Sequence, residues 1–110
     1  MANAYKVLGQ SSPSAVTATT LYTVPSATET VVSTIFVCNR GSTAGTYRIA
    51  IRPDGATLSN EHYIAYDAVL LGNDSIAITT GVTIDATDVI TVYASTANFS
   101  FNAFGSEITA

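Results

Sequence analysis

Hydrophobic and polar residues alternate with a period of two along several segments of the chain. The clearest case is TYRIAIR, where Tyr47, Ile49 and Ile51 alternate with smaller or charged residues. This period is typical of a β-strand with one buried face. We therefore predict that the Tyr47 face is buried and that Arg48 and Arg52 point to solvent or to a partner. A shift by one residue would bury both arginines unpaired.

The segment EHYIAYD alternates in the same way. Its pattern places His62, Ile64 and Tyr66 on one face of a strand. Tyr63 and Asp67 are expected on the other face, because successive side chains of a strand point to opposite sides. The alternation thus predicts that Tyr63 and Tyr66 are separated by the sheet.

The segment TVVSTIFVCN is apolar on both faces from Ile35 to Cys38. This pattern indicates a central strand that is covered on both sides. Cys38 is therefore predicted to be buried and unreactive, because apolar surroundings raise the pKa of a thiol. It is the only cysteine in the sequence, which excludes an intrachain disulfide and a metal cluster built on cysteines.

Turn-forming residues separate these segments, as in VPSATE, NRGSTAG, RPDGA and DATD. Val and Ile far outnumber Leu, and β-branched side chains favour strands over helices. Eight strands are predicted, at residues 5–9, 19–24, 30–39, 46–52, 62–67, 75–79, 89–94 and 99–108. Short strands with polar turns at this spacing predict an all-β fold, a single antiparallel β-sandwich that is jelly-roll-like.

The chain of 110 residues has the size of one domain. Residues 1–110 are therefore expected to form a single β-sandwich around one core. The low-complexity stretch SSPSAVTATT, residues 11–20, is interpreted either as a surface loop or as an arm laid across a neighbour. The loop is favoured, since long loops are common at the ends of jelly rolls.

Charged residues are scarce, at 11% of the sequence, against about 25% in an average soluble domain. The net charge is −4, and the only cations besides the two strand arginines are Lys6 and Arg40. This balance disfavours partners that carry phosphate, both nucleic acid and an anionic membrane. A surface so poor in charge suits a protein that hides much of it against other proteins.

The beginning, MANAYKVLGQ, contains no apolar core of signal-peptide length. No apolar run approaches the roughly 18 residues of a membrane-spanning helix. The chain is therefore expected to stay in the cytoplasm where it is made, unless it leaves inside an assembly.

Few residues suggest catalysis. His62 is the only histidine, it lies in a predicted strand, and no Gly-x-Ser-x-Gly motif is present. Asp85 and Asp88 share a loop and are interpreted as turn caps, with a calcium site as the less favoured alternative. The sequence predicts a protein that is not an enzyme and needs no metal or cofactor.

Aromatic residues suggest contact surfaces. Tyrosines are expected mainly in the core and at interfaces, although a sugar-binding face is the alternative. In VYASTANFSFNAFG, Phe99 and Phe101 fall on one face of a last strand that would close the sandwich, with Phe104 beyond them. Phe104 would then be free for a neighbouring subunit. The candidate interface residues are Phe104, Phe99, Arg48, Arg52 and Tyr63.

Four segments together resemble a known kind of sequence: LYTVPSATETVVSTIFVCNRGSTAGTYRIAIRPDG, NEHYIAYD, GNDSI and TVYASTANFSFNAFGSEI. They are similar to the small all-β structural proteins of tailed-bacteriophage virions, and the likeness runs from residue 5 to residue 108. Its most specific parts are residues 21–25, 37–40, 62–67 and 92–105. None of these is a catalytic signature.

The resemblance implies an assembly role in the virion as a homo-oligomer, and a trimer is expected because jelly-roll-like virion proteins commonly form trimers. It implies that the partners are other copies of the chain and other phage proteins, such as the major capsid protein or tail proteins. A capsid decoration (cement) protein is the first expectation, and a tail, baseplate or fibre component is the second. A different class, a carbohydrate-binding module in host adhesion, remains the alternative.

Overall fold

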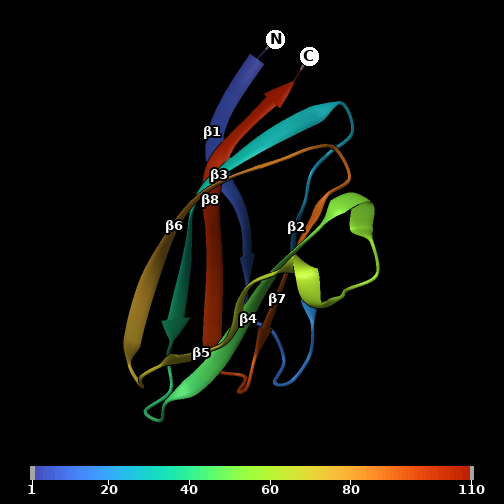
Figure 1. Ribbon diagram of the computed structural model, residues 1–110. Helices are drawn as coiled ribbons and strands as arrows, with labels where there is room; N and C mark the ends of the chain where they lie inside the picture. Colours follow the sequence, from blue (N-terminus) through green and yellow to red (C-terminus); the bar gives the residue numbers. More distant parts are fainter. Residues whose placement is uncertain (1, 110) are drawn as a thin grey trace.

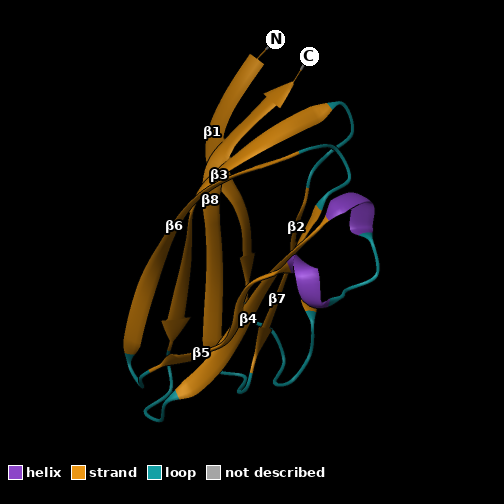
Figure 2. Ribbon diagram, in the orientation of Figure 1, coloured by secondary structure: helices purple, strands orange, loops and turns teal. Residues whose placement is uncertain are grey.

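Two four-stranded antiparallel sheets pack face to face in the computed structural model, which describes residues 2–109 (Figure 1). Two 3₁₀ turns, η1 (Pro53–Gly55) and η2 (Asn60–His62), lie in the connection between the fourth and fifth strands (Figure 2). Among the described residues, no helix is long and apolar enough to cross a membrane. The strands are β1 (Ala2–Ser11), β2 (Thr19–Thr23), β3 (Thr28–Asn39), β4 (Gly45–Arg52), β5 (Tyr63–Leu70), β6 (Asp74–Ile84), β7 (Val89–Ala94) and β8 (Phe99–Thr109).

The strand order is that of a jelly roll. Sheet I has the order β1-β8-β3-β6, and sheet II has the order β2-β7-β4-β5. The first strand pairs with the last, the second with the seventh, the third with the sixth and the fourth with the fifth. This nested pairing is what results when one long hairpin is rolled into a two-layer sandwich. The prediction of an antiparallel, jelly-roll-like sandwich of about eight strands is confirmed.

The core between the sheets is built from alternate residues of their strands. Tyr47 and Ile49 of β4 are buried, and Ile51 is partly buried against the same core, so the predicted inward face of β4 is confirmed. From the opposite sheet, Phe99 and Phe101 of β8 are both 0% exposed. The ring centroids of Tyr47 and Phe101 lie 6.3 Å apart, which links the two layers through aromatic contact.

The β3 strand is central in sheet I, but only one of its faces is covered. Val32, Ile35 and Val37 are 0% exposed on the inner face. On the outer face Phe36 is 42% exposed and Cys38 is only half-buried. The prediction that Cys38 is buried was therefore wrong, because no third layer formed by residues 2–109 covers the outer face of sheet I.

The low-complexity stretch forms the connection between the two sheets at the start of the chain. Residues 12–18 are a loop between β1 and β2. The loop is held to the sandwich by a hydrogen bond from the Val16 N–H to the Ala94 carbonyl, with a length of 2.8 Å. The interpretation as a loop is confirmed. Both ends of the chain lie at the same end of the sandwich (Figure 1).

Candidate interaction surfaces

The predicted interface residues are distributed over three parts of the fold. Phe104 lies on the outer face of sheet I, whereas Arg48, Arg52 and Tyr63 lie on sheet II. Phe99 is fully buried between the sheets. Its position removes Phe99 from the candidate interface, because a partner cannot reach it without opening the sandwich.

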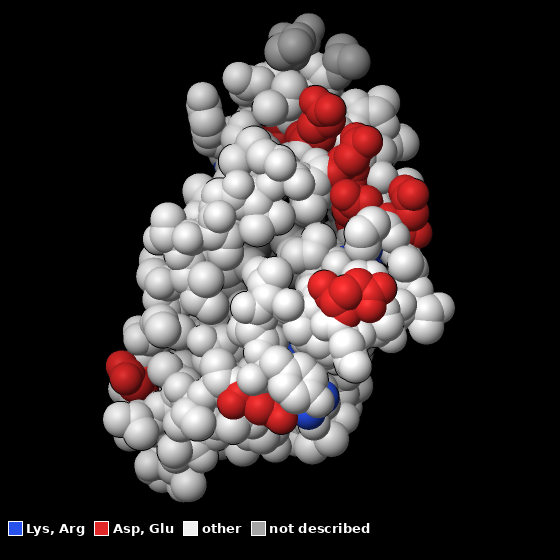
Figure 3. All heavy atoms as spheres, viewed as in Figure 1, with Lys and Arg blue, Asp and Glu red and all other residues white. Residues whose placement is uncertain are grey.

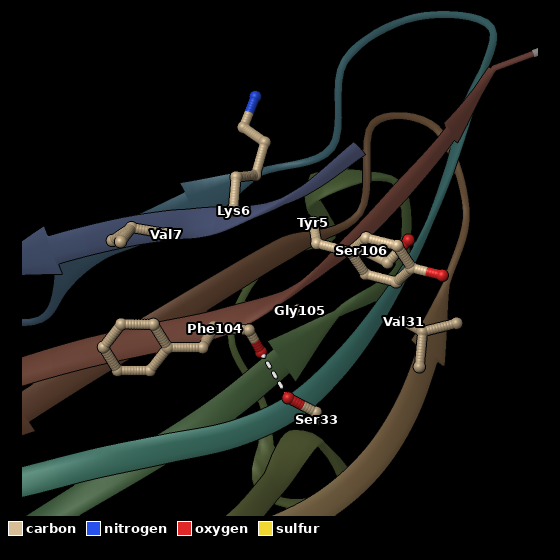
Figure 4. A pocket seen from close by; sticks show the side chains of 8 residues that line it. All are labelled: Tyr5, Lys6, Val7, Val31, Ser33, Phe104, Gly105 and Ser106. Atoms are coloured by element: carbon tan, nitrogen blue, oxygen red, sulfur yellow. Dashed lines mark hydrogen bonds between the residues drawn. The ribbon is translucent and has the colours of Figure 1, made fainter. Parts of the chain in front are cut away.

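An apolar groove crosses the outer face of sheet I over β1, β8 and β3 (Figure 4). Antiparallel register brings its residues together, since Val7 of β1 pairs with Phe104 of β8, and Ser106 of β8 pairs with both Tyr5 and Val31. Paired residues of neighbouring strands point to the same face. The groove has a volume of ≈ 570 Å³ and is lined by Tyr5, Lys6, Val7, Val31, Ser33, Phe104, Gly105 and Ser106.

The groove continues onto Phe36 of β3. The rings of Phe36 and Phe104 meet edge to face, with centroids 5.6 Å apart. Tyr5 is 83% exposed and Val7 is 47% exposed, so much of this apolar surface faces solvent in the single chain. Below Phe104, the Ser33 hydroxyl donates a hydrogen bond of 3.1 Å to the Phe104 carbonyl, which fixes the backbone there (Figure 4).

Lys6, the one charged residue among the described residues that line the groove, is paired with a residue outside it. The Lys6 side chain at its rim points away from Phe104 (Figure 4). Its Nζ atom instead forms an ion pair of 2.9 Å with Glu107 Oε1. The groove therefore presents an apolar surface with only hydroxyl and backbone polar groups, and it offers no charged partner to a ligand.

A buried polar network lies between the sheets behind this groove. The Tyr22 hydroxyl is 2.5 Å from Glu107 Oε2 and 2.8 Å from the Thr30 hydroxyl. The hydrogen bond from Tyr22 and then the one from Lys6 hold the pKa of the Glu107 carboxyl below its usual value. Burial and the bond to Glu107 raise the pKa of Tyr22 to about 12. The network joins β1, β2, β3 and β8, and no local sequence pattern indicates it.

On the outer face of sheet II, Arg48 is enclosed by residues of the two neighbouring strands. Its guanidinium carbon lies 4.3 Å from the ring centroid of Tyr66 and 4.2 Å from that of Tyr93. Arg48 Nε and Nη2 also donate to the two carboxylate oxygens of Asp67, at 2.7 and 3.3 Å. The bond with Asp67 raises the pKa of Arg48. Asp67 thus engages one edge of the guanidinium and two tyrosine rings pack against it within the chain.

Irregular pairing between β4 and β5 creates this arrangement. Tyr47 pairs with Ala68 and Ile49 with Ala65, so that both Tyr66 and Asp67 lie opposite Arg48. Asp67 has a φ of 51°, a left-handed conformation that aspartate tolerates better than most residues. A second shift in register follows Ile49. The predicted regular alternation of EHYIAYD was therefore wrong.

The consequence is that Tyr63 and Tyr66 are not separated by the sheet. Their ring centroids are 4.8 Å apart and their planes meet at 80°. Together with Asn60 of η2 they line an open hollow of ≈ 480 Å³ beside the Arg48 stack. We call this site, which is lined by Asn60, Tyr63 and Tyr66, the tyrosine hollow. A regular alternation of residues along β5 does not predict it.

Arg52 lies farther along β4, where η1 and η2 pack over the outer face of sheet II. Neighbouring Ala50 is only 1% exposed for this reason. The Arg52 side chain is half-buried, and within the described part of the chain its Nε atom is buried without a hydrogen-bond partner. Arg52 is thus further from solvent than the sequence indicates.

The loop aspartates bind backbone groups. The Asp88 carboxylate accepts hydrogen bonds from the N–H groups of Asp54 and Asp85, at 2.9 and 2.8 Å. Across residues 2–109, no group of three or more His, Cys, Asp or Glu side chains could hold a metal ion. Asp88 thus acts as a turn cap.

Acidic side chains gather on the side of η1 and η2, while the face over β6 is almost free of charge (Figure 3).

The histidine and the cysteine belong to different parts of the fold. His62 Nδ1 accepts a hydrogen bond of 3.1 Å from the Ser59 N–H, which closes the turn before β5 of sheet II. Cys38 lies on β3 of sheet I. The structure therefore does not bring the two residues together as a nucleophile and its base.

Cys38 is expected to react in the folded protein. Its neighbours across the sheet, Ser75 and Ser100, are small and leave the thiol accessible. In dilute solution, a small thiol reagent should modify wild type quickly without denaturant. In the matched control, Cys38→Ser combined with Val37→Cys, the thiol points into the core and should react only upon unfolding. Equal, slow reaction of both proteins would contradict this assignment of faces.

Comparison of this chain with protein-family models, with curated proteins and with solved structures finds no match.

Proposed function

We propose that this protein is an assembly protein of a tailed-bacteriophage particle, a capsid decoration (cement) protein that self-associates. The observation that supports the proposal best is the apolar groove on sheet I. Its residues Tyr5, Val7 and Phe36 are 83%, 47% and 42% exposed in the single chain. Contiguous exposed apolar surface of this kind is typical of protein contact sites.

The occupant of the groove is proposed to be a second copy of the chain. The groove has no unpaired charge, since Lys6 is engaged by Glu107. Its complement must therefore be apolar and uncharged as well, because an opposing charge would lose its hydration without a partner. The outer face of sheet I in another copy meets this requirement. Interfaces between permanently associated copies are more apolar than ordinary surface.

Three copies are expected from the resemblance to phage structural proteins. A trimer that touches a particle at several equivalent positions binds more tightly than any one of its sites. The same reasoning holds for a capsid surface and for a tail, baseplate or fibre, which is the second location proposed. The protein would then be found in the virion after synthesis in the bacterial cytoplasm.

Phe104→Ser is expected to weaken self-association while the subunit stays folded. Phe104 packs on Phe36 at the surface, so its loss removes apolar contact area without opening the core. Sedimentation velocity should show a dissociation constant at least about tenfold higher than that of wild type, which corresponds to about 1.4 kcal/mol.

The matched control is Val69→Ser, which removes an apolar side chain that is 69% exposed on β5 of sheet II. Its association should equal that of wild type. Equal association of Phe104→Ser and wild type, or equal weakening by both variants, would contradict the role of the groove.

Co-sedimentation separates the two proposed locations. Purified protein is mixed with capsids and, separately, with tails of the phage whose genome encodes it. Pelleting with capsids supports decoration, and pelleting with tails supports the second location. Failure to pellet with either would refute the assembly function.

A further inference from the structure

The tyrosine hollow on sheet II has the geometry of a small binding site. The Tyr63 and Tyr66 rings meet at 80° and form two walls at right angles, and Asn60 contributes an amide group at the rim. Tyr66 is 57% exposed, so its ring is open to a ligand. Among residues 2–109, the side chains of Asn60, Tyr63 and Tyr66 form no hydrogen bond with another residue. Their polar groups remain available.

The walls of the hollow are fixed before a ligand arrives. Arg48 stacks on the Tyr66 ring at 4.3 Å and is itself held by the Tyr93 ring and by the two hydrogen bonds that it donates to Asp67. The register shifts of β5 bring Tyr66 and Asp67 to Arg48 together. Bulges of this kind redirect side chains and often lie next to functional sites. Aromatic walls that are already ordered lower the entropy cost of binding.

The chemistry of the hollow selects the ligand. A pyranose ring has an apolar C–H face that packs on an aromatic ring, and hydroxyl groups at its edge that bond to amide and phenol groups. The hollow provides both kinds of contact. The guanidinium of Arg48 is already neutralised by Asp67, and the neighbouring Glu61 side chain is 75% exposed. Net attraction for an acidic sugar is therefore absent.

We propose that the tyrosine hollow binds a neutral saccharide, with one hexopyranose ring packed against Tyr63 and Tyr66. The site lies on sheet II and uses none of the groove residues of sheet I. The proposal therefore goes beyond the assembly function and does not depend on it.

The test is a nuclear magnetic resonance titration of the full chain with neutral glucose, galactose and mannose trisaccharides. At least one should give saturable shifts with a millimolar dissociation constant. Each of Tyr63→Ala and Tyr66→Ala should raise that constant about threefold to tenfold. Tyr63→Phe, which keeps the ring, should retain most of the affinity.

The matched control is Tyr5→Ala, which removes a tyrosine that is 83% exposed on sheet I and should leave binding unchanged. A sialylated trisaccharide should bind more weakly than the best neutral one. The proposal is overturned by no saturable shift up to about 50 mM of any neutral trisaccharide. It is also overturned if folded Tyr66→Ala binds as wild type does. Neither result bears on self-association, which is measured separately.

Discussion

Phe101→Ser is expected to leave the chain largely unfolded. Phe101 is 0% exposed, and its ring lies 6.3 Å from that of Tyr47 and 6.4 Å from that of Phe99. Removing a buried phenylalanine ring costs about 3–5 kcal/mol, and a serine hydroxyl without a partner adds to this cost. Domains are stable by about 5–15 kcal/mol, and a small single domain near the lower end of that range loses most or all of its stability.

Far-UV circular dichroism with urea unfolding measures this effect. The matched control is Phe104→Ser, the same substitution three positions along β8, on the outer face. Its unfolding midpoint should stay close to that of wild type in dilute solution. A folded Phe101→Ser protein, with a midpoint equal to that of Phe104→Ser, would show that β8 is oriented differently.

Glu107→Gln is expected to destabilise the fold at neutral pH by about 1–3 kcal/mol, the usual cost of an impaired buried hydrogen bond to a charged group. The oxygen of the glutamine amide can accept a hydrogen bond from Tyr22 or from Lys6. The NH₂ group then faces the other of these two residues, which loses its acceptor. Most of the effect should come through Tyr22, which is 8% exposed, because water screens Lys6, whose side chain is 47% exposed.

The pH dependence of stability gives a second measure of the same network. The pKa of Glu107 is lower in the folded chain than in the unfolded chain. The carboxylate therefore contributes stability that is complete above about pH 4.3, its unfolded value, and is lost as the pH falls through the lower folded value. The difference in unfolding free energy between wild type and Glu107→Gln should shrink over that acid range. A difference that stays constant from pH 7 to pH 2 would contradict the assignment.

The sequence predicted the architecture well where side chains alternate strictly. In β4, large apolar residues alternate with arginines and an alanine, and this pattern predicts that Tyr47 and Ile49 are buried, as they are. The length of β6 was underestimated, because it extends from Asp74 to Ile84 through Thr79, Thr80 and Gly81. Small hydroxyl residues and glycine carry little periodic signal on an exposed edge strand.

Alternation failed where the pairing of strands is irregular. The register shifts between β4 and β5 depend on both strands, and the sequence of β5 alone reads as regular. Tyr63 and Tyr66 were therefore expected on opposite faces, although their rings are 4.8 Å apart. The one weak signal in the sequence is the aspartate at position 67, because aspartate tolerates the left-handed φ of 51° that the chain adopts there.

Long-range polar contacts could not be predicted from the sequence either. Glu107 bonds to Tyr22 and Lys6, which are 85 and 101 positions away along the chain. The local sequence pattern does not predict that Glu107 is buried, because its partners Lys6 and Tyr22 lie on β1 and β2 and contact it only in the folded sandwich. Likewise, an apolar strand such as β3 does not reveal whether its second face is covered by its own chain or left open to a partner.

The mass of wild type in solution tests the central claim of self-association most directly. Light scattering across micromolar concentrations should give a mass of three chains, with a shift toward smaller species only on dilution. The exposed groove of Tyr5, Val7 and Phe104 is the surface expected to be covered. A single-chain mass at every micromolar concentration, for protein that also fails to pellet with phage capsids or tails, would contradict the account.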